Sequence, residues 1–218
     1  MPSLYLNQDT ILYLRSLQRS TEKADLEFLG AFDFDERGDI ERIHLKRGTF
    51  MELLDPDFEV NFHTHPDGDD TYPDHPSYAD AIYVLLETGQ RNNAQMHLVV
   101  TPNFIYTLAA SSRLRKAVNG KGDAFLDAYK ERVVALWDEC ALKVPDRGQH
   151  EFRRCWVEAL RTFGFDVEVY AFDDLLESDG VRIPLRDVVV KHHPLEHTGT
   201  LLFIMSFAIV AGITIMSR

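Results

Sequence analysis

The most constraining feature of this sequence is a segment in which a strand pattern, a long polar loop and a helix pattern follow one another. Residues 61–80 read NFHTHPDGDDTYPDHPSYAD and contain three histidines, five aspartates and one serine. At its start, apolar residues alternate with polar ones, which predicts a half-buried β-strand: Phe58, Val60 and Phe62. Because side chains alternate between the faces of a strand, His63 and His65 share one face. The chain must therefore place two imidazoles side by side near the end of a strand.

The second half of this segment predicts the start of a helix. Residues 76–90 read PSYADAIYVLLETGQ, with Ser77 at the expected start and Asp80 in the expected first turn. Two imidazole nitrogens and a carboxylate oxygen form a typical zinc ligand set. Each part also has an ordinary explanation, since His-x-His pairs occur in solvated loops and Ser-x-x-Asp resembles a helix capping box. Their joint order favours a metal centre formed by His63, His65 and Asp80.

The remaining patterns predict an α/β fold. Before residue 120 we expect one helix beginning near Asp9 and several strands, at 26–35, 40–48, 58–66 and in a pair over 94–111. Beyond Gly120 apolar residues recur at helical spacing over 126–140 and 152–163, and a strand pattern follows at 165–172. Residues 171–198 are charged and irregular, which is typical of a closing segment and a linker.

Charge and cysteine content narrow the function classes. The formal net charge is -12, and a nucleic-acid partner is not expected because phosphate binding needs a basic surface. The two cysteines, Cys140 and Cys155, both fall on apolar helical stripes. A disulfide is therefore not expected, and a reducing compartment is the default.

The C-terminal segment has the composition of a membrane span. Residues 199–217 contain no charged side chain. As a helix they would reach about 28 Å, close to the hydrocarbon thickness of a bilayer. A buried core helix is the alternative, but such a helix usually keeps a polar face. Only Arg218 follows, so we expect a single-pass tail anchor with the preceding domain on the cytosolic side.

These residues resemble the signature of the JAMM (MPN+) metalloprotease family. His63-Thr64-His65-Pro66 followed by Ser77-x-x-Asp80 is similar to the two-part motif, and Glu27-Phe28-Leu29-Gly30 fits the early strand that carries the family's glutamate. The resemblance covers roughly residues 8–110, including Thr101-Pro102 at a turn. The long loop and overall style are most similar to JAMM-like proteins of large DNA viruses.

The resemblance implies a fold and a reaction. The fold is a JAMM/MPN-like curved mixed β-sheet flanked by helices over residues 1–120, with an α-helical extension and linker over 121–198. The activity is zinc-dependent removal of ubiquitin or a ubiquitin-like modifier, here from conjugates at a membrane surface. Zn²⁺ would be held by His63, His65 and Asp80. Glu27 would be the general base and Ser77 the hydrogen-bond donor to the oxyanion.

Two other functions remain open at this stage. One is a membrane-tethered, non-catalytic MPN-type binding module, although such scaffolds characteristically lack the ligand set. The other is a JAMM peptidase with a substrate other than ubiquitin, because eleven residues separate His65 from Ser77, more than is typical of the family. The extra residues should form a loop over 67–76. Its acidic and aromatic side chains either contact the substrate or form a solvated tip: Asp69, Asp70, Tyr72 and Asp74.

Other constellations and ligands fit less well. The run from His63 to Asp67 resembles the start of a metallo-β-lactamase motif, but Gly68 stands where that motif needs a histidine. Amidohydrolases also begin with His-x-His, but they need a barrel of about 250 residues. His75 is a possible substitute ligand, expected to be solvated. Three other carboxylates are rivals of Glu27 and are expected on the surface: Glu22, Glu41 and Glu59.

Overall fold

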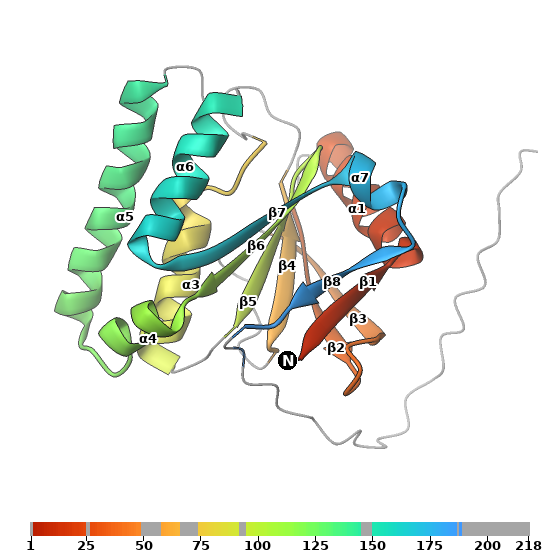
Figure 1. The fold of residues 1–218 in the computed structure, drawn as a ribbon, viewed down its shortest axis with the longest axis horizontal. Coiled ribbons are helices and arrows are strands. Elements are labelled where there is room, and N and C mark those ends of the chain that lie inside the picture. The colour runs from red at the N-terminus through yellow and green to blue at the C-terminus, as the bar shows by residue number, and fades with distance from the viewer. Residues whose placement is uncertain are drawn as a thin grey trace, which may run out of the picture.

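A mixed six-stranded sheet forms the middle layer of the fold (Figure 1). The computed structural model describes residues 2–24, 27–48, 58–65, 74–91, 95–144, 150–186 and 188. The strand order is β3-β2-β4-β5-β6-β7. Their bounds are Glu27–Phe34 for β2, Ile40–Gly48 for β3, Val60–Thr64 for β4, Met96–Val100 for β5, Phe104–Ala110 for β6 and Phe165–Ala171 for β7.

Only β4 and β5 are parallel among the neighbouring strands of this sheet, and the other pairs are antiparallel. This follows from their connections. Helix α3 (Tyr78–Arg91) joins β4 to β5, and a helical crossover returns the chain in the same direction. A short turn joins β5 to β6, closed by the Thr101 amide donating to the Phe104 carbonyl at 2.9 Å. The expected mixed α/β sheet is therefore present.

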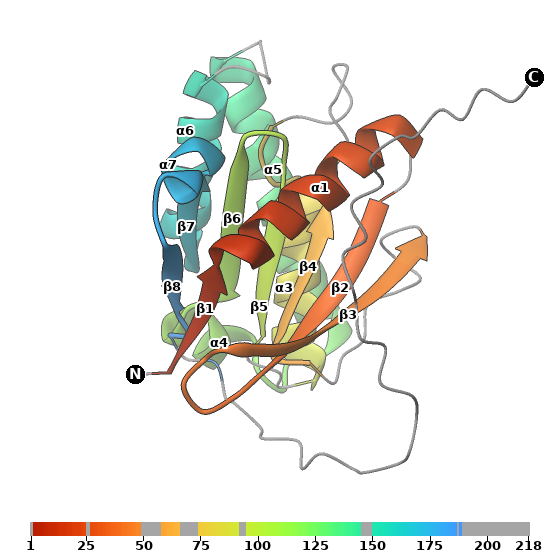
Figure 2. The same cartoon turned by 90° about the vertical axis from the view of Figure 1, so that its right-hand side faces the viewer.

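Helices cover both faces of the sheet. Helix α1 (Gln8–Ala24) crosses one face, beside α7 (Phe172–Leu176) (Figure 2). The same side carries a two-stranded ribbon in which β1 (Ser3–Asn7) pairs antiparallel with β8 (Gly180–Pro184). The other face is covered by α3, α5 (Asp123–Lys143) and α6 (His150–Phe163), with α4 (Ser112–Val118) at one end (Figure 1).

Strand alternation divides the apolar residues between two cores. On β4, Val60 and Phe62 belong to the core beneath α1. On β6, Ile105 belongs to that core, whereas Tyr106 belongs to the core beneath α3, α5 and α6. Gly30 of β2 makes room for this packing, because a Cβ at that position would lie 2.4 Å from the Phe62 ring. His63 of β4, on the face opposite the Val60 and Phe62 side chains, therefore faces α3 and not α1.

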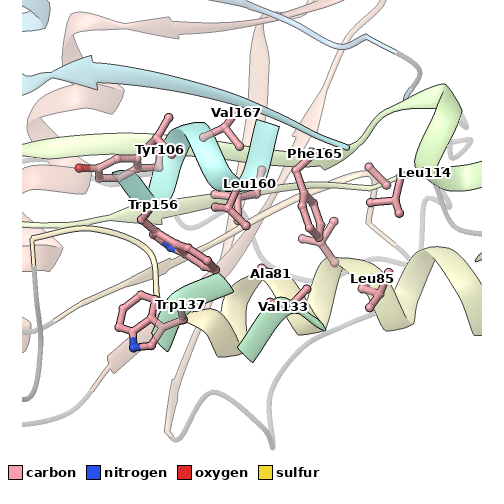
Figure 3. Close-up of a cluster of buried hydrophobic side chains, with 14 of the residues drawn as sticks. Ala81, Leu85, Tyr106, Leu114, Val133, Trp137, Trp156, Leu160, Phe165 and Val167 are labelled. Carbon is pink, nitrogen blue, oxygen red and sulfur yellow. The ribbon is translucent and has the colours of Figure 1, made fainter. Parts of the chain in front are cut away.

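The described residues between 121 and 186 either belong to the sheets or pack on them. The predicted helices are present as α5 and α6, and β7 pairs with β6 at the sheet edge. The segment expected to be irregular contains α7 and β8. Figure 3 shows Trp137 of α5 and Trp156 of α6 packed toward α3 and the sheet, and their ring centroids lie 5.0 Å apart. This region is thus part of the folded unit that holds β4 and α3.

The expectation of no disulfide is wrong in this structure. Cys140 of α5 and Cys155 of α6 are joined by a disulfide. The physical reason is that the apolar stripes of the two helices face each other, so the two side chains meet in the helix–helix contact. The cysteines consequently lend no support to a reducing compartment.

Within the described ranges, which end at residue 188, there is no helix with the length and apolar character needed to cross a bilayer. The expected anchor at 199–217 lies outside those ranges.

Candidate metal centre

Strand pairing gathers the predicted residues on one face of the sheet. His63 of β4 pairs with Leu29 of β2 in antiparallel register. Continuing that register by two residues places Glu27 opposite His65. Cross-strand partners share a face, so these three polar side chains lie on the same side, beneath α3. His63 and His65 are 1% and 5% exposed, and their ring centroids are 4.7 Å apart.

A reciprocal capping arrangement holds Asp80 over this face. The Ser77 amide donates to Asp80 Oδ2 at 2.6 Å, and the Asp80 amide donates to Ser77 Oγ at 3.3 Å. The Ser77 hydroxyl also donates to Asp80 Oδ2 at 2.9 Å. This is the capping box that the sequence pattern allows, with aspartate in place of the usual glutamate. It fixes the carboxylate in the first turn of α3 and also occupies the hydroxyl of Ser77.

Asp80 bridges the two histidines. Its Oδ1 lies 3.3 Å from His63 Nε2, and its Oδ2 lies 3.4 Å from His65 Nε2. Charged hydrogen bonds are usually shorter, about 2.7–2.9 Å. Two ligand atoms on one tetrahedral zinc, each about 2.0–2.1 Å from it, lie about 3.3 Å apart. Asp80 therefore lies within reach of both predicted histidine ligands, at spacings longer than those of ordinary charged hydrogen bonds.

A third histidine, His97, was not predicted from the sequence. It lies on β5 opposite Asn61 of β4, and its Nε2 is 2.7 Å from His63 Nδ1. Ligating atoms of His63, Asp80 and His97 all lie within 4.8 Å of one another, so this buried group could hold a metal ion. The 2.7 Å separation of His63 Nδ1 from His97 Nε2 is that of a hydrogen bond and is too short for these two particular atoms to bind one zinc. His63 and Asp80 thus belong to both the predicted ligand set and this group, in which His97 stands where the prediction has His65.

Burial and charge set the protonation of this group. Burial lowers the pKa of His63 well below its usual value, and it lowers the pKa of His97 to about 4. Burial alone would raise the pKa of Asp80, but the adjacent His63 and His65 outweigh burial and lower it. These directions favour neutral imidazoles at His63 and His97 and an ionised carboxylate at Asp80, the forms in which such groups bind metals.

Glu27 has the properties of a proton acceptor. Burial raises the pKa of its carboxyl, partly opposed by the charge of His65 and assisted by that of Asp80. Within the described part of the chain, its Oε2 is a buried atom with no hydrogen-bond partner. A buried carboxylate oxygen in this state needs a partner that a water, a metal-bound group or a substrate would supply. The side chain therefore points to chemistry at this position more than to packing.

Side chains of α5 and α6 contact His75 and Pro76, which come shortly before the start of α3. The indole of Trp156 donates to the Pro76 carbonyl at 2.9 Å. His75 is 1% exposed, and its ring lies 4.7 Å from Phe152 and 5.2 Å from Trp137 between centroids. The expectation of a solvated His75 is thus wrong, because the aromatic side chains of two helices enclose it. By fixing residues 75 and 76, these helices position the capping box that follows.

The structure also describes two alternative candidates for the base, Glu41 and Glu59, and the loop residue Asp74. Glu41 is exposed on β3, as expected, whereas Glu59 is buried at 8% exposure and so is no ordinary surface carboxylate. Asp74 accepts from the Asn103 side chain at 2.9 Å and from the Thr101 hydroxyl at 2.5 Å. It anchors the end of the long loop to the β5–β6 turn. Pro66 through Pro73 and the side chain of Glu22 lie outside the described residues.

Two surface cavities lie away from this centre. One, of about 470 Å³, is beside the disulfide between α5 and α6, and the other, of about 340 Å³, is beside β7. Neither is lined by His63 or Asp80.

Comparison with known proteins gives no matching family model, no matching curated protein and no matching solved structure. The interpretation of the centre therefore depends on its own geometry.

Proposed function

We propose that this chain is a zinc-dependent hydrolase of amide bonds, of the JAMM type, that removes ubiquitin or a ubiquitin-like modifier from proteins at a membrane surface. The observation that carries the proposal is the bridging position of Asp80 between His63 Nε2 and His65 Nε2 at 3.3 and 3.4 Å. Glu27 beside it carries a buried oxygen without a partner in the described part of the chain. The mixed six-stranded sheet is compatible with the fold that the family resemblance of the sequence implies.

The roles of the side chains follow from their surroundings. Bound zinc would supply Lewis acidity toward the scissile carbonyl and toward water. Glu27 would accept a proton from the attacking water and return it to the leaving amine, a role suited by its raised pKa. Ser77 would stabilise the oxyanion only if its hydroxyl exchanged its bond to Asp80 for one to the substrate.

A second candidate function is a non-catalytic binding module of the same fold. It is favoured by the complete capping box of Ser77 and Asp80, which satisfies these groups without a metal or a substrate. A hydrolase with a substrate other than ubiquitin is a variant of the main proposal. It is favoured by the long loop, whose end is fastened to the sheet through Asp74.

We also propose that residues 199–217 tether the domain to a membrane with the domain in the cytosol. The support is their lack of charge and their length, about that of a bilayer's hydrocarbon core. Tethering would confine the enzyme to conjugates at the same surface, where a high effective concentration offsets weak affinity.

Zinc content and cleavage test the proposal together. Full-length protein should contain one zinc by elemental analysis, and His63→Ala and Asp80→Ala should lose most of it. His44→Ala is a matched control, because that histidine is half-buried on β3 and bonded to Asp33. A panel of di-ubiquitin linkages should be cleaved by the wild type and not after treatment with a chelator. Zinc retained in both ligand variants would refute the centre. Zinc without cleavage of any ubiquitin-like conjugate would favour the binding module or another substrate.

A further inference from the structure

A line of buried polar side chains connects the backbone carbonyl of Phe58 to His63. Gln95 Nε2 donates to that carbonyl at 2.8 Å, and Asn61 Nδ2 donates to Gln95 Oε1 at 3.4 Å. His97 Nδ1 bonds to Asn61 Oδ1, and His97 Nε2 lies 2.7 Å from His63 Nδ1. All four side chains are at most 3% exposed. We call these four residues, Gln95, Asn61, His97 and His63, the relay.

The backbone carbonyl of Phe58, which can only accept a hydrogen bond, sets the donor and the acceptor of every bond in the relay. A carbonyl oxygen can only accept, so the amide nitrogen of Gln95 must face Phe58 and its oxygen must face Asn61. The amide nitrogen of Asn61 is then the donor, and its oxygen faces His97. His97 Nδ1 must therefore carry a proton, which leaves the lone pair of a neutral imidazole on Nε2. His63 Nδ1 must in turn be the donor to that lone pair.

Tyr83 of α3 supports the same orientation of both amides. Its hydroxyl accepts from Asn61 Nδ2 at 3.2 Å and donates to Gln95 Oε1 at 3.1 Å. Turning either amide around would set two donors or two acceptors against each other at these contacts. The neutral state of both histidines agrees with their complete burial, which penalises an imidazolium.

We propose that His97 is a positioning residue that holds His63 as the Nδ1–H tautomer and so directs the Nε2 lone pair toward Asp80 as a metal-ligand atom. This inference rests on the proposed metal site. Histidine ligands commonly donate their second N–H to a carboxylate or a backbone carbonyl. In this chain the acceptor is another imidazole, whose own proton is fixed by two amides and ultimately by the Phe58 carbonyl.

The tautomer is measurable without any metal. Full-length protein with ¹⁵N-labelled histidine, freed of metal with a chelator, should show a proton on Nδ1 and a bare Nε2 for His63 in two-bond ¹⁵N–¹H spectra near pH 7.5. His97 should show the same tautomer. His97→Leu should abolish the single tautomer of His63. A His63 ring protonated on Nε2 in the wild type would overturn the inference, whatever the variants do.

Zinc affinity, measured by competition with a chelating indicator, tests the consequence for the site. His97→Leu should weaken Zn²⁺ binding about 10- to 100-fold, the usual effect of losing such a partner. His97→Gln should stay closer to wild type, because its amide oxygen can accept from His63 and its nitrogen can donate to Asn61. Thr107→Val is the matched control, since this buried threonine of β6 bonds to the Glu168 amide, outside the relay. It should bind Zn²⁺ as the wild type does.

The two proposals fail in different ways. Equal Zn²⁺ affinity in His97→Leu and the wild type would overturn the positioning role and leave the metal site intact. Affinity as weak in His97→Gln as in His97→Leu would show that the imidazole itself is needed, either for packing or as a metal ligand, and would also overturn the positioning role. Absence of Zn²⁺ binding in the wild type, with the expected His63 tautomer, would overturn the proposed hydrolase and support the direction of the relay.

Discussion

Two carboxyl groups beside the same histidines have pKa values that move in opposite directions. Burial raises the pKa of Glu27. Burial opposes ionisation of Asp80 as well, but the two adjacent imidazoles lower its pKa below the ordinary range. A pair of titratable groups separated in this way is typical of sites where one group exchanges protons and the other remains charged. Asp80 is therefore suited to hold a cation and Glu27 to move a proton.

Glu27→Gln should retain zinc and lose turnover by at least about 100-fold, because only the proton acceptor is removed. In the wild type, activity should fall as the pH drops through the raised pKa of Glu27, so the acid limb should lie above the ordinary value of 4.5. Cleavage rates against pH and elemental analysis measure both effects. Glu41→Gln, an exposed carboxylate on β3, is the control. Wild-type turnover in Glu27→Gln would assign the base to another group.

Ser77→Ala should separate a capping role from a catalytic one. Loss of the helix cap should lower the free energy of unfolding by about 1 kcal/mol. Ser111→Ala is a matched control, because Ser111 caps α4 by accepting from the Leu114 amide. Both variants should lose similar stability in denaturant titrations, but only Ser77→Ala should lose turnover at unchanged zinc content. If neither variant loses turnover, or if both lose the same small amount, Ser77 acts only as a helix cap.

The buried neutral histidines should make the metal-free protein sensitive to acid. The pKa of His97 is lowered to about 4, whereas an unfolded histidine titrates near 6.5. Between these values the unfolded state binds more protons, so stability is fully present above pH 6.5 and is lost as the pH falls toward 4. Urea unfolding at several pH values, with chelator, should show this slope. It should be shallower in His97→Gln, and an unchanged slope would assign the effect to other groups.

At the scale of elements, local pattern predicted most of the architecture. Alternation located the six strands of the main sheet, and helical spacing located α3, α5 and α6. Pattern missed α4, α7 and the β1–β8 ribbon, because short segments carry few periods and a ribbon joining distant residues has no local signal.

In the site, the sequence did not identify His97, because it lies in an apolar strand, MHLVV, whose composition is typical of a buried core strand. The weak clue was the repeated spacing of Asn61-x-His63 and Gln95-x-His97 on neighbouring strands.

The disulfide between α5 and α6 should contribute measurable stability. Its cysteines are 15 residues apart, and a loop of that length corresponds to about 3 kcal/mol in the chain-entropy description. Adding a reductant should therefore lower the free energy of unfolding in denaturant titrations. The double variant Cys140→Ser, Cys155→Ser should start lower and should not respond to reductant. An equal response of both proteins would show that the bond does not form in solution.

At the scale of the whole molecule, membrane attachment is a separate prediction. The full-length chain should remain in the membrane pellet after alkaline carbonate extraction, because residues 199–217 are long and uncharged. A chain ending at Glu196 should be soluble and should still cleave conjugates. Release of the full-length chain as readily as the shorter one would identify the segment as a buried helix.

The pairing of β1 with β8 has a consequence for biosynthesis. Ser3 lies in register with Pro184, so β1 leaves the ribosome long before its partner strand exists. The six strands of the main sheet and the cap of α3 can form earlier, since their partners are nearer in the chain. Until β8 emerges, the edge of β1 stays open to other chains. A message truncated between β7 and β8 would therefore yield all six strands of the main sheet with an exposed, aggregation-prone edge on β1 beside them.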